Sequence, residues 1–204
     1  MVAVKVCGLT RVADAVLAAD LGASAIGCVF WDKSPRFVAP SVAARIREAL
    51  PSHVAVVGVF VNSSLARIEE VRTEVGLNGI QLHGNETQEF CESLSGDVIR
   101  AVTLENENDL DDLVELPKSW TLLLDAHDPV RRGGTGRVVN WTLAARLAAR
   151  RRLFLAGGLK ADNIAEAVRM VRPYGVDISS GLESQPGVKC EQLMKEFFSA
   201  MAGV

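Results

Sequence analysis

Two side chains stand at the ends of apolar runs, where an acid–base pair would be placed. Cys7 closes the run Ala3–Cys7 and is followed by Gly8, and Asp125 ends Thr121–Asp125 after three leucines. A carboxylic acid is costly to bury without a role, which favours a functional Asp125 over a carboxylate that only caps a loop. Cys7 alone is typical of a small buried hydrophobe, and as a base it needs its thiolate form. Together they are candidates for a pair of groups that transfer protons.

Glycine-bearing segments follow three of the apolar runs and are candidates for binding a phosphate. Gly157-Gly158 precedes a helical pattern, Ser180-Gly181 precedes a turn, and Gly133–Gly136 forms a third set. Backbone N–H groups of such loops bind phosphate, often together with the N-terminus of a helix. A tight turn would explain a single glycine pair, but three sets on neighbouring loops favour a phosphate site. Its candidate residues are Gly134, Gly158, Ser180 and Gly181.

Three further polar side chains lie near strand ends, with roles that the residues alone leave open. Arg36 can hold a carboxylate with its planar guanidinium, although a surface arginine is the simpler interpretation. Asp177 lies inside an apolar run, two residues before Ser179, and either contacts a ligand or bonds neighbouring loops. His83 is either a proton carrier or a structural histidine at a strand end. We keep Arg36 and Asp177 as candidate substrate contacts and interpret His83 as structural.

Short apolar runs rich in Val, Ile and Leu are predicted to be β-strands that position these residues. Eight such runs alternate with helical patterns at intervals of roughly 20–30 residues, which is typical of parallel strands joined by right-handed crossovers. Eight units favour closure into a (β/α)8 TIM barrel, with residues 1–204 as a single domain and the active site in the loops after the strands. The predicted strands are Ala3–Cys7, Ala25–Phe30, Ala55–Val61, Gly79–Leu82, Val98–Thr103, Thr121–Asp125, Leu153–Ala156 and Val176–Ser179.

Helical spacing of apolar residues marks the segments between the strands. The predicted helices are Arg11–Leu21, Ser64–Val75, Asn106–Leu116, Ala161–Val171 and Glu191–Met201. Asn85 with Gln88 three residues later resembles a capping box, and Asp162 can cap or charge a first turn. The basic run from Arg146 to Arg152 is predicted to be the solvated end of a helix rather than a polyanion site.

Composition and charge argue against several classes of protein. Hydrophobic residues make up 49% of the 204 residues, and the net charge of −3 gives no general attraction for nucleic acid or an anionic membrane. No apolar run approaches the ~20 residues of a membrane span, and no signal peptide is visible, so we expect a cytoplasmic protein. The four cysteines have neither CxxC nor zinc spacing and are expected to be reduced thiols. Histidines and carboxylates do not cluster as ligands, so we expect no metal.

Seven groups of motif residues follow one another in a fixed order. They are Lys5–Thr10; Ser34-Pro35-Arg36; Gly58–Val61; Gln81–Gly84 with Glu86; Leu123–Asp125 with Gly133–Gly136; Leu155–Leu159 with Asn163; and Asp177–Gly181 with Glu183. In this order they resemble the motifs of the phosphoribosylanthranilate isomerase family, and the similarity spans nearly the whole chain. Several motifs are individually weak, but the ordered set is highly specific.

The resemblance implies the same barrel fold and an Amadori rearrangement in tryptophan biosynthesis, without a metal or an organic cofactor. N-(5′-phosphoribosyl)anthranilate would become 1-(2-carboxyphenylamino)-1-deoxyribulose 5-phosphate, with Asp125 as general acid and Cys7 as general base. Arg36 would hold the anthranilate carboxylate, and the glycine-bearing loops would hold the phosphate. The implied partner is thus a small phosphorylated sugar derivative, while monomer and homodimer both stay open.

Two positions depart from the family pattern. Asn140 stands before Trp141 where the family usually has aspartate, and Cys190 follows Lys189 where aspartate is frequent. Both positions are expected to lie at helix starts, so we expect the local capping to differ and the chemistry to be retained.

Related functions form the alternatives. The isomerase of the histidine pathway uses an aspartate as its strand-one base, which Cys7 argues against; a barrel that accepts both aminoaldoses is harder to exclude. Ribulose-phosphate 3-epimerase would need histidine and carboxylate ligands for a metal, and the chain has only His53, His83 and His127. A non-catalytic barrel that binds a phosphorylated ligand would not need both Cys7 and Asp125.

Overall fold

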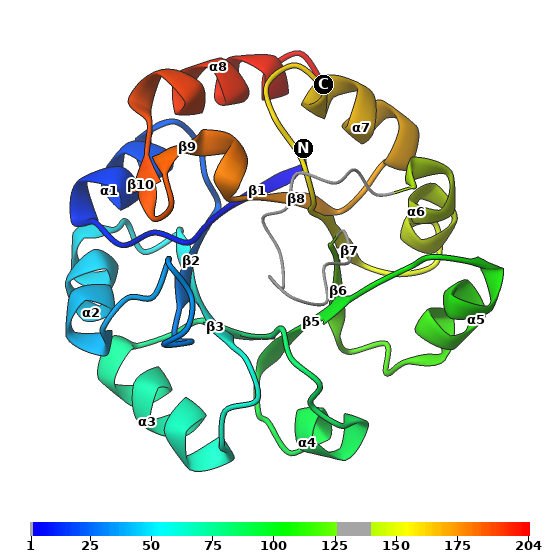
Figure 1. Cartoon of the computed structure of the whole chain (residues 1–204), viewed down its shortest axis with the longest axis horizontal. Helices are drawn as coiled ribbons and strands as arrows, with labels where there is room; N and C mark the ends of the chain where they lie inside the picture. The colour runs from blue at the N-terminus through cyan, green and yellow to red at the C-terminus, as the bar shows by residue number, and fades with distance from the viewer. Residues whose placement is uncertain (1, 126–139) are drawn as a thin grey trace.

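Eight parallel strands close into a barrel, as the alternation of strand and helix patterns predicts. The computed structural model describes residues 2–125 and 140–204 of the chain. Neighbouring strands pair in the order of the sequence, and β8 pairs with β1 to close the barrel. Figure 1 shows the strands as an inner ring with the helices outside it. The strands are β1 (Ala3–Cys7), β2 (Ala25–Val29), β3 (Ala55–Phe60), β4 (Gly79–Leu82), β5 (Asp97–Val102), β6 (Thr121–Leu124), β7 (Leu153–Leu155) and β8 (Gly175–Ile178).

Helices lie between successive strands, and a short hairpin precedes the last helix. The helices are α1 (Val12–Asp20), α2 (Pro40–Ala49), α3 (Leu65–Val75), α4 (Gln88–Glu92), α5 (Glu107–Glu115), α6 (Trp141–Ala148), α7 (Ile164–Val171) and α8 (Glu191–Met201). After β8 the chain forms a 3-10 turn, η1 (Ser180–Leu182), and the antiparallel pair β9 (Glu183–Gln185) and β10 (Val188–Lys189). Among the described residues, no helix has the length and apolar character needed to cross a membrane.

Side chains on each strand alternate between the helix layer and the barrel interior. On β1, Val4 and Val6 belong to the large core cluster between strands and helices, so Lys5 and Cys7 point inward. A separate apolar cluster fills part of the interior; its buried members are Ala25, Val57, Ile99, Leu123, Phe154 and Ala156. The barrel is therefore packed inside, and inward-facing polar groups gather toward the carboxyl ends of the strands.

The structure corrects two predicted helix starts. The cap of α4 is Thr87, whose hydroxyl accepts from the amide of Phe90, whereas the backbone amide of Asn85 donates to Asn62 Oδ1 at 2.7 Å. Asn62 has a left-handed φ of +51°, which asparagine adopts more readily than most residues, and its side chain reaches the loop after β4. The prediction of a capping box at Asn85 is therefore wrong, and a capping box forms at Asn106 instead.

The second correction concerns α7. This helix begins at Ile164 rather than at Ala161, with Asn163 rather than Asp162 in the capping position. The Asn163 side chain instead braces the preceding loop: its Nδ2 donates to the carbonyl of Gly158 at 2.9 Å, and its Oδ1 accepts from the amide of Lys160 at 2.9 Å. The loop after β7 is thus held by an asparagine at the helix start.

The basic run after α6 is only partly solvated. Arg150 is exposed, but Arg151 is buried, with 6% of its surface accessible. Its guanidinium donates to backbone carbonyls at the end of α5 and before β6, those of Leu113, Val114, Leu116, Pro117 and Trp120. The prediction of a solvated helix end is therefore wrong for Arg151, because these orphan carbonyls satisfy its charge.

Candidate active site

The proposed base lies at the carboxyl end of β1, facing the interior. Cys7 is 8% exposed and packs with Val29, Val59 and Trp31. Burial raises the pKa of the Cys7 thiol, and the positive charge of Lys5 opposes this rise; the net effect leaves the pKa above its ordinary value. A neighbouring cation therefore faces the sulfur, which sequence reasoning had not identified.

That cation is part of a buried ion pair between the first and last strands. Lys5 is fully buried, and its Nζ donates to Asp177 Oδ1 at 2.7 Å. The two residues are register partners on β1 and β8, so strand pairing itself brings them together. The sequence left open whether Asp177 contacts a ligand or makes a structural bond. The structure gives it at least a structural partner. The available signal was the spacing of Lys5 and Cys7, which two residues apart share one face of a strand.

The proposed acid follows β6. Asp125 continues the strand pairing through its amide, which donates to the carbonyl of Val102 at 3.2 Å, and its side chain is 14% exposed. His83 Nε2 lies 3.7 Å from Asp125 Oδ2. Asp125 therefore stands at the same end of the barrel as Cys7, because Cys7 ends β1 and Asp125 directly follows β6 in the same parallel barrel. Figure 1 shows β1 and β6 apart on the ring of strands.

His83 is held in its neutral form beside this carboxylate. Burial lowers the pKa of His83 to about 4. Gln81 Nε2 lies 3.0 Å from His83 Nδ1, and with the amide as donor the ring proton sits on Nε2, facing Asp125. His83 is therefore a neutral neighbour of the acid near pH 7, consistent with a structural role.

Arg36, on the loop after β2, has a strong partner that the sequence had not revealed. Its Nε lies 2.9 Å from Glu183 Oε1 and its Nη2 lies 2.7 Å from Glu183 Oε2, a bidentate pair. Lys189 Nζ also bonds Glu183 Oε1 at 2.9 Å and the carbonyl of Ser179 at 3.0 Å. The hairpin of β9 and β10 therefore fixes the orientation of Arg36 at the mouth.

The glycine-bearing loops after β7 and β8 pack against each other. Gly158 has a φ of +69°. A Cβ at Gly181 would collide with the carbonyl oxygen of Leu159, so glycine is required where the two loops meet. Ser180 and Gly181 form η1 beside this contact. The structure thus brings Gly158, Ser180 and Gly181 to one side of the mouth, whereas Gly134 lies outside the described residues.

The two departures from the family pattern have different local consequences. Asn140 still caps α6, because its Oδ1 accepts from the amides of Thr142 at 3.0 Å and Leu143 at 3.3 Å. Cys190 occupies the capping position of α8 without a side-chain hydrogen bond. The expected difference in capping therefore applies to Cys190 and not to Asn140.

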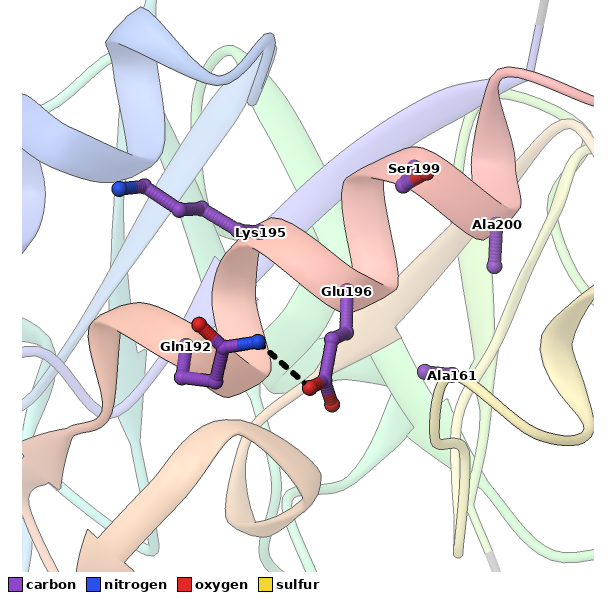
Figure 2. A pocket seen from close by; sticks show the side chains of 6 residues that line it. All are labelled: Ala161, Gln192, Lys195, Glu196, Ser199 and Ala200. Carbon is purple, nitrogen blue, oxygen red and sulfur yellow. Dashed lines mark hydrogen bonds between the residues drawn. The ribbon is translucent and has the colours of Figure 1, made fainter.

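A shallow depression on the outer surface is unrelated to this mouth. It lies along α8 and is lined by Ala161, Gln192, Lys195, Glu196, Ser199 and Ala200. Figure 2 shows Gln192 donating to Glu196, a bond of 2.7 Å, on the solvent side of the helix. Across residues 2–125 and 140–204, no group of three or more histidine, cysteine or acidic side chains is arranged to hold a metal ion.

Comparison with known proteins gives a consistent result across the chain. The family model described as N-(5′-phosphoribosyl)anthranilate (PRA) isomerase matches residues 4–200. The isomerase of that name from Pelobacter propionicus is 47% identical over 197 residues, covering 97% of this chain and 94% of the relative. The protein of the same name from Geobacter sulfurreducens is 43% identical over 203 residues, and the alignment covers 100% of both chains.

Solved structures agree with the sequence comparison. The crystal structure of phosphoribosyl anthranilate isomerase from Thermotoga maritima matches with a TM-score of 0.92 and 39% identity, covering 100% of both chains. A structure of the isomerase in complex with reduced 1-(o-carboxyphenylamino)-1-deoxyribulose 5-phosphate matches with a TM-score of 0.89 and 38% identity, again over 100% of both chains. A further match, with a TM-score of 0.88, 37% identity and full coverage of both chains, is of mutually generated monomers of the dimeric Thermotoga maritima enzyme. The chain described here belongs to the N-(5′-phosphoribosyl)anthranilate isomerase family.

Proposed function

We propose that this chain performs the reaction of its family, the isomerisation of N-(5′-phosphoribosyl)anthranilate to 1-(2-carboxyphenylamino)-1-deoxyribulose 5-phosphate, with Cys7 as base and Asp125 as acid. The observation that carries the proposal is the family match over residues 4–200 combined with a thiol and a carboxylate at one end of the barrel. We also propose that the whole chain works as one barrel domain.

Proton transfer by the two groups accounts for the whole rearrangement. Asp125 gives a proton to the furanose ring oxygen while the nitrogen lone pair forms a C=N bond, which opens the ring to a protonated Schiff base. Cys7, as thiolate, takes the proton from C2′, and the C–H electrons move toward the iminium nitrogen to give an enolamine. This species gains a proton at C1′ and loses one from the C2′ hydroxyl, giving the ketone. Proton gains and losses balance, so no cofactor enters the scheme.

The remaining contacts bind the two ends of the substrate. Arg36 would receive the anthranilate carboxylate: Glu183 engages Nε and Nη2, and among the described residues Nη1 makes no hydrogen bond. Asp177 bonds Lys5 through Oδ1 alone within the described part of the chain, which leaves Oδ2 for a sugar hydroxyl.

The phosphate would lie at the mouth side formed by the loops after β7 and β8. Gly158, Ser180 and Gly181 are the candidate N–H donors there, and Gly134 would add a further donor from its own loop. The meeting of the two loops at Gly181 and Leu159 supports this placement, because it brings their amides to one side of the mouth.

The free cysteines bear on where the protein works, and the placement of the catalytic groups bears on its oligomeric state. We propose a reducing, cytoplasmic location, because all four cysteines are free thiols and a thiol base has to stay reduced. Each chain carries both proposed catalytic groups, so a monomer and a homodimer are equally compatible with activity. Size-exclusion chromatography with light scattering measures the molar mass in solution and distinguishes the monomer from the homodimer.

The test is a fluorescence assay on purified protein. Consumption of phosphoribosylanthranilate should appear as loss of its anthranilate-type fluorescence, and this loss should be abolished in Cys7→Ala and Asp125→Ala. Cys190→Ser and Asp111→Asn are the matched controls. Cys190 is partly exposed and Asp111 is exposed, and neither has a proposed part in catalysis or substrate binding. Full turnover by either mouth variant would remove its assignment, and a folded wild type without turnover would favour a binding protein for phosphorylated ligands.

A further inference from the structure

Lys5 is the most deeply buried charge near the proposed base. It lies on the same face of β1 as Cys7, is fully buried, and bonds the Asp177 carboxylate at 2.7 Å. Burial lowers the pKa of Lys5, but Asp177 and Cys7 raise it more, so the net pKa lies above its ordinary value and the ammonium stays charged. A fixed positive charge therefore stands inside the barrel next to the sulfur.

Gly27 on β2 makes room for both groups. It is the register partner of Cys7, and a Cβ at Gly27 would lie 2.7 Å from Cys7 Sγ and 3.1 Å from Lys5 Nζ. Both distances are shorter than normal van der Waals contact, so any side chain here would displace the sulfur, the ammonium or both. The two atoms thus converge over the same glycine, which places them within Coulombic reach of each other.

Other charged or titratable groups also face this site. From β8, Asp177 opposes the effect of Lys5 on the sulfur, and from β10, Lys189 reinforces it. The titratable groups whose charges act on Cys7 or Lys5 from the surrounding elements are Asp177, Lys189, His83 and Cys28, of which Cys28 points into the core between strands and helices. Lys189 is committed to Glu183 and the carbonyl of Ser179, whereas Lys5 has Asp177 as its anchor. Lys5 is therefore the cation whose position is set by the strands themselves.

We propose that Lys5 is a positioning residue for the isomerisation: Asp177 holds its ammonium beside Cys7, where it favours the thiolate that removes the C2′ proton. The proposal rests on the function proposed above. The thiol releases its own proton to water, and the thiolate then accepts the proton of C2′. Because Lys5 acts on the reacting C2′ atom through the sulfur, and on substrate binding only indirectly through Asp177, removing it should slow the chemical step more than it weakens binding.

The ionisation of Cys7 can be measured without substrate, from the pH dependence of its alkylation by iodoacetamide, followed by mass spectrometry. A Cys190→Ser background removes the partly exposed thiol. We expect Lys5→Met to raise the alkylation midpoint by at least about one pH unit, which is a tenfold loss of thiolate at fixed pH. Lys5→Arg should keep it close to that of wild type.

Activity supplies the second readout. In the fluorescence assay, kcat of Lys5→Met should fall at least about tenfold with little change in KM, and Lys5→Arg should recover part of the loss. Lys118→Met is the control, because this exposed lysine bonds a backbone carbonyl of Val114 away from the mouth. A folded Lys5→Met protein with a wild-type midpoint, or with a raised midpoint and unchanged kcat, overturns the proposal.

If Lys5→Met does not fold, a double variant replaces it in the test. Lys5→Met with Asp177→Asn removes the buried pair as a unit and leaves no unpaired charge. Its midpoint should still lie above that of wild type, because the cation exerts the larger effect on Cys7. A wild-type midpoint in the double variant overturns the proposal. Failure of the wild type to isomerise substrate would instead reject the function while leaving the alkylation result intact.

Discussion

Two buried cations at opposite ends of the barrel are satisfied in different ways. Among the described residues, Arg151, near the amino ends of β6 and β7, donates only to backbone carbonyls at the end of α5 and before β6. We call this region the floor. None of these partners titrates, so the floor keeps the same charge at any ordinary pH. Its arginine ties the end of α5 to the barrel.

Lys5, toward the carboxyl ends of the strands, is bonded to a carboxylate and lies beside a thiol. We call this end the mouth. Here Arg36, Glu183 and Lys189 form a second group of paired charges. Apart from the carbonyl of Ser179, which also accepts from Lys189, the partners of these cations are carboxylates or a thiol. The comparison teaches that a buried charge indicates chemistry only when its partners are themselves titratable; surrounded by carbonyls alone, it indicates stability.

Asp125→Asn is the strongest test of the difference between the mouth and the floor. An amide keeps the shape of the carboxyl group but cannot give the proton that opens the ring, so kcat should fall about 10³-fold. The free energy of unfolding should change by less than about 1 kcal/mol, as for most partly exposed positions. The fluorescence assay and urea denaturation measure the two quantities. A large loss of stability together with retained activity would place Asp125 with the floor rather than the mouth.

Arg151→Met is the converse experiment. Methionine retains much of the apolar volume but leaves several buried carbonyls without a donor, so unfolding should become easier by about 3 kcal/mol. The kcat and KM of the folded protein should match wild type. Arg150→Met is the control, because that side chain is 51% exposed and its 4.0 Å pair with Asp111 contributes little. A loss of turnover without a loss of stability would contradict the division between the two ends.

The fold could be read from the sequence, because strands and helices are dictated by local apolar patterns. The bounds of Ala3–Cys7, Gly79–Leu82 and Glu191–Met201 agree with the predicted ones, and the other strands differ by one residue at one or both ends. The helix start at Asn85 was wrong because the asparagine bonds Asn62, a residue outside its own segment. Local pattern thus predicts elements well and their caps less well.

The candidate site was predictable only in part. Cys7 and Asp125 were found because strand ends in a barrel meet at one mouth. The partners that surround them were not: Lys5 bonds a residue 172 positions away, and Arg36 bonds one 147 positions away. Such pairs depend on how the strands close, which no local window contains. The spacing of Lys5 and Cys7 was the one local signal.

Arg36→Met tests whether the paired charges of the mouth also bind substrate. Loss of the charged contact with the anthranilate carboxylate should raise KM roughly 30- to 100-fold, while kcat changes only a few-fold. Glu183 keeps its 2.9 Å bond to Lys189, so the hairpin should stay folded. Arg36→Lys should recover only part of the affinity, because an ammonium lacks the planar fork. An unchanged KM in steady-state assays would leave Arg36 as a structural partner of Glu183 alone.

His83 tests whether a residue of the mouth makes the free energy of unfolding depend on pH, which the floor does not. Burial lowers its pKa to about 4, whereas the unfolded side chain titrates near 6.5. Between these values the unfolded chain binds more protons than the folded one, so the free energy of unfolding falls as pH falls. For this partly exposed ring we expect a contribution of about 1–2 kcal/mol between pH 7 and pH 5, absent from His83→Asn. Urea denaturation of both proteins across this range measures it, and parallel pH profiles would show that folding does not lower the pKa of His83.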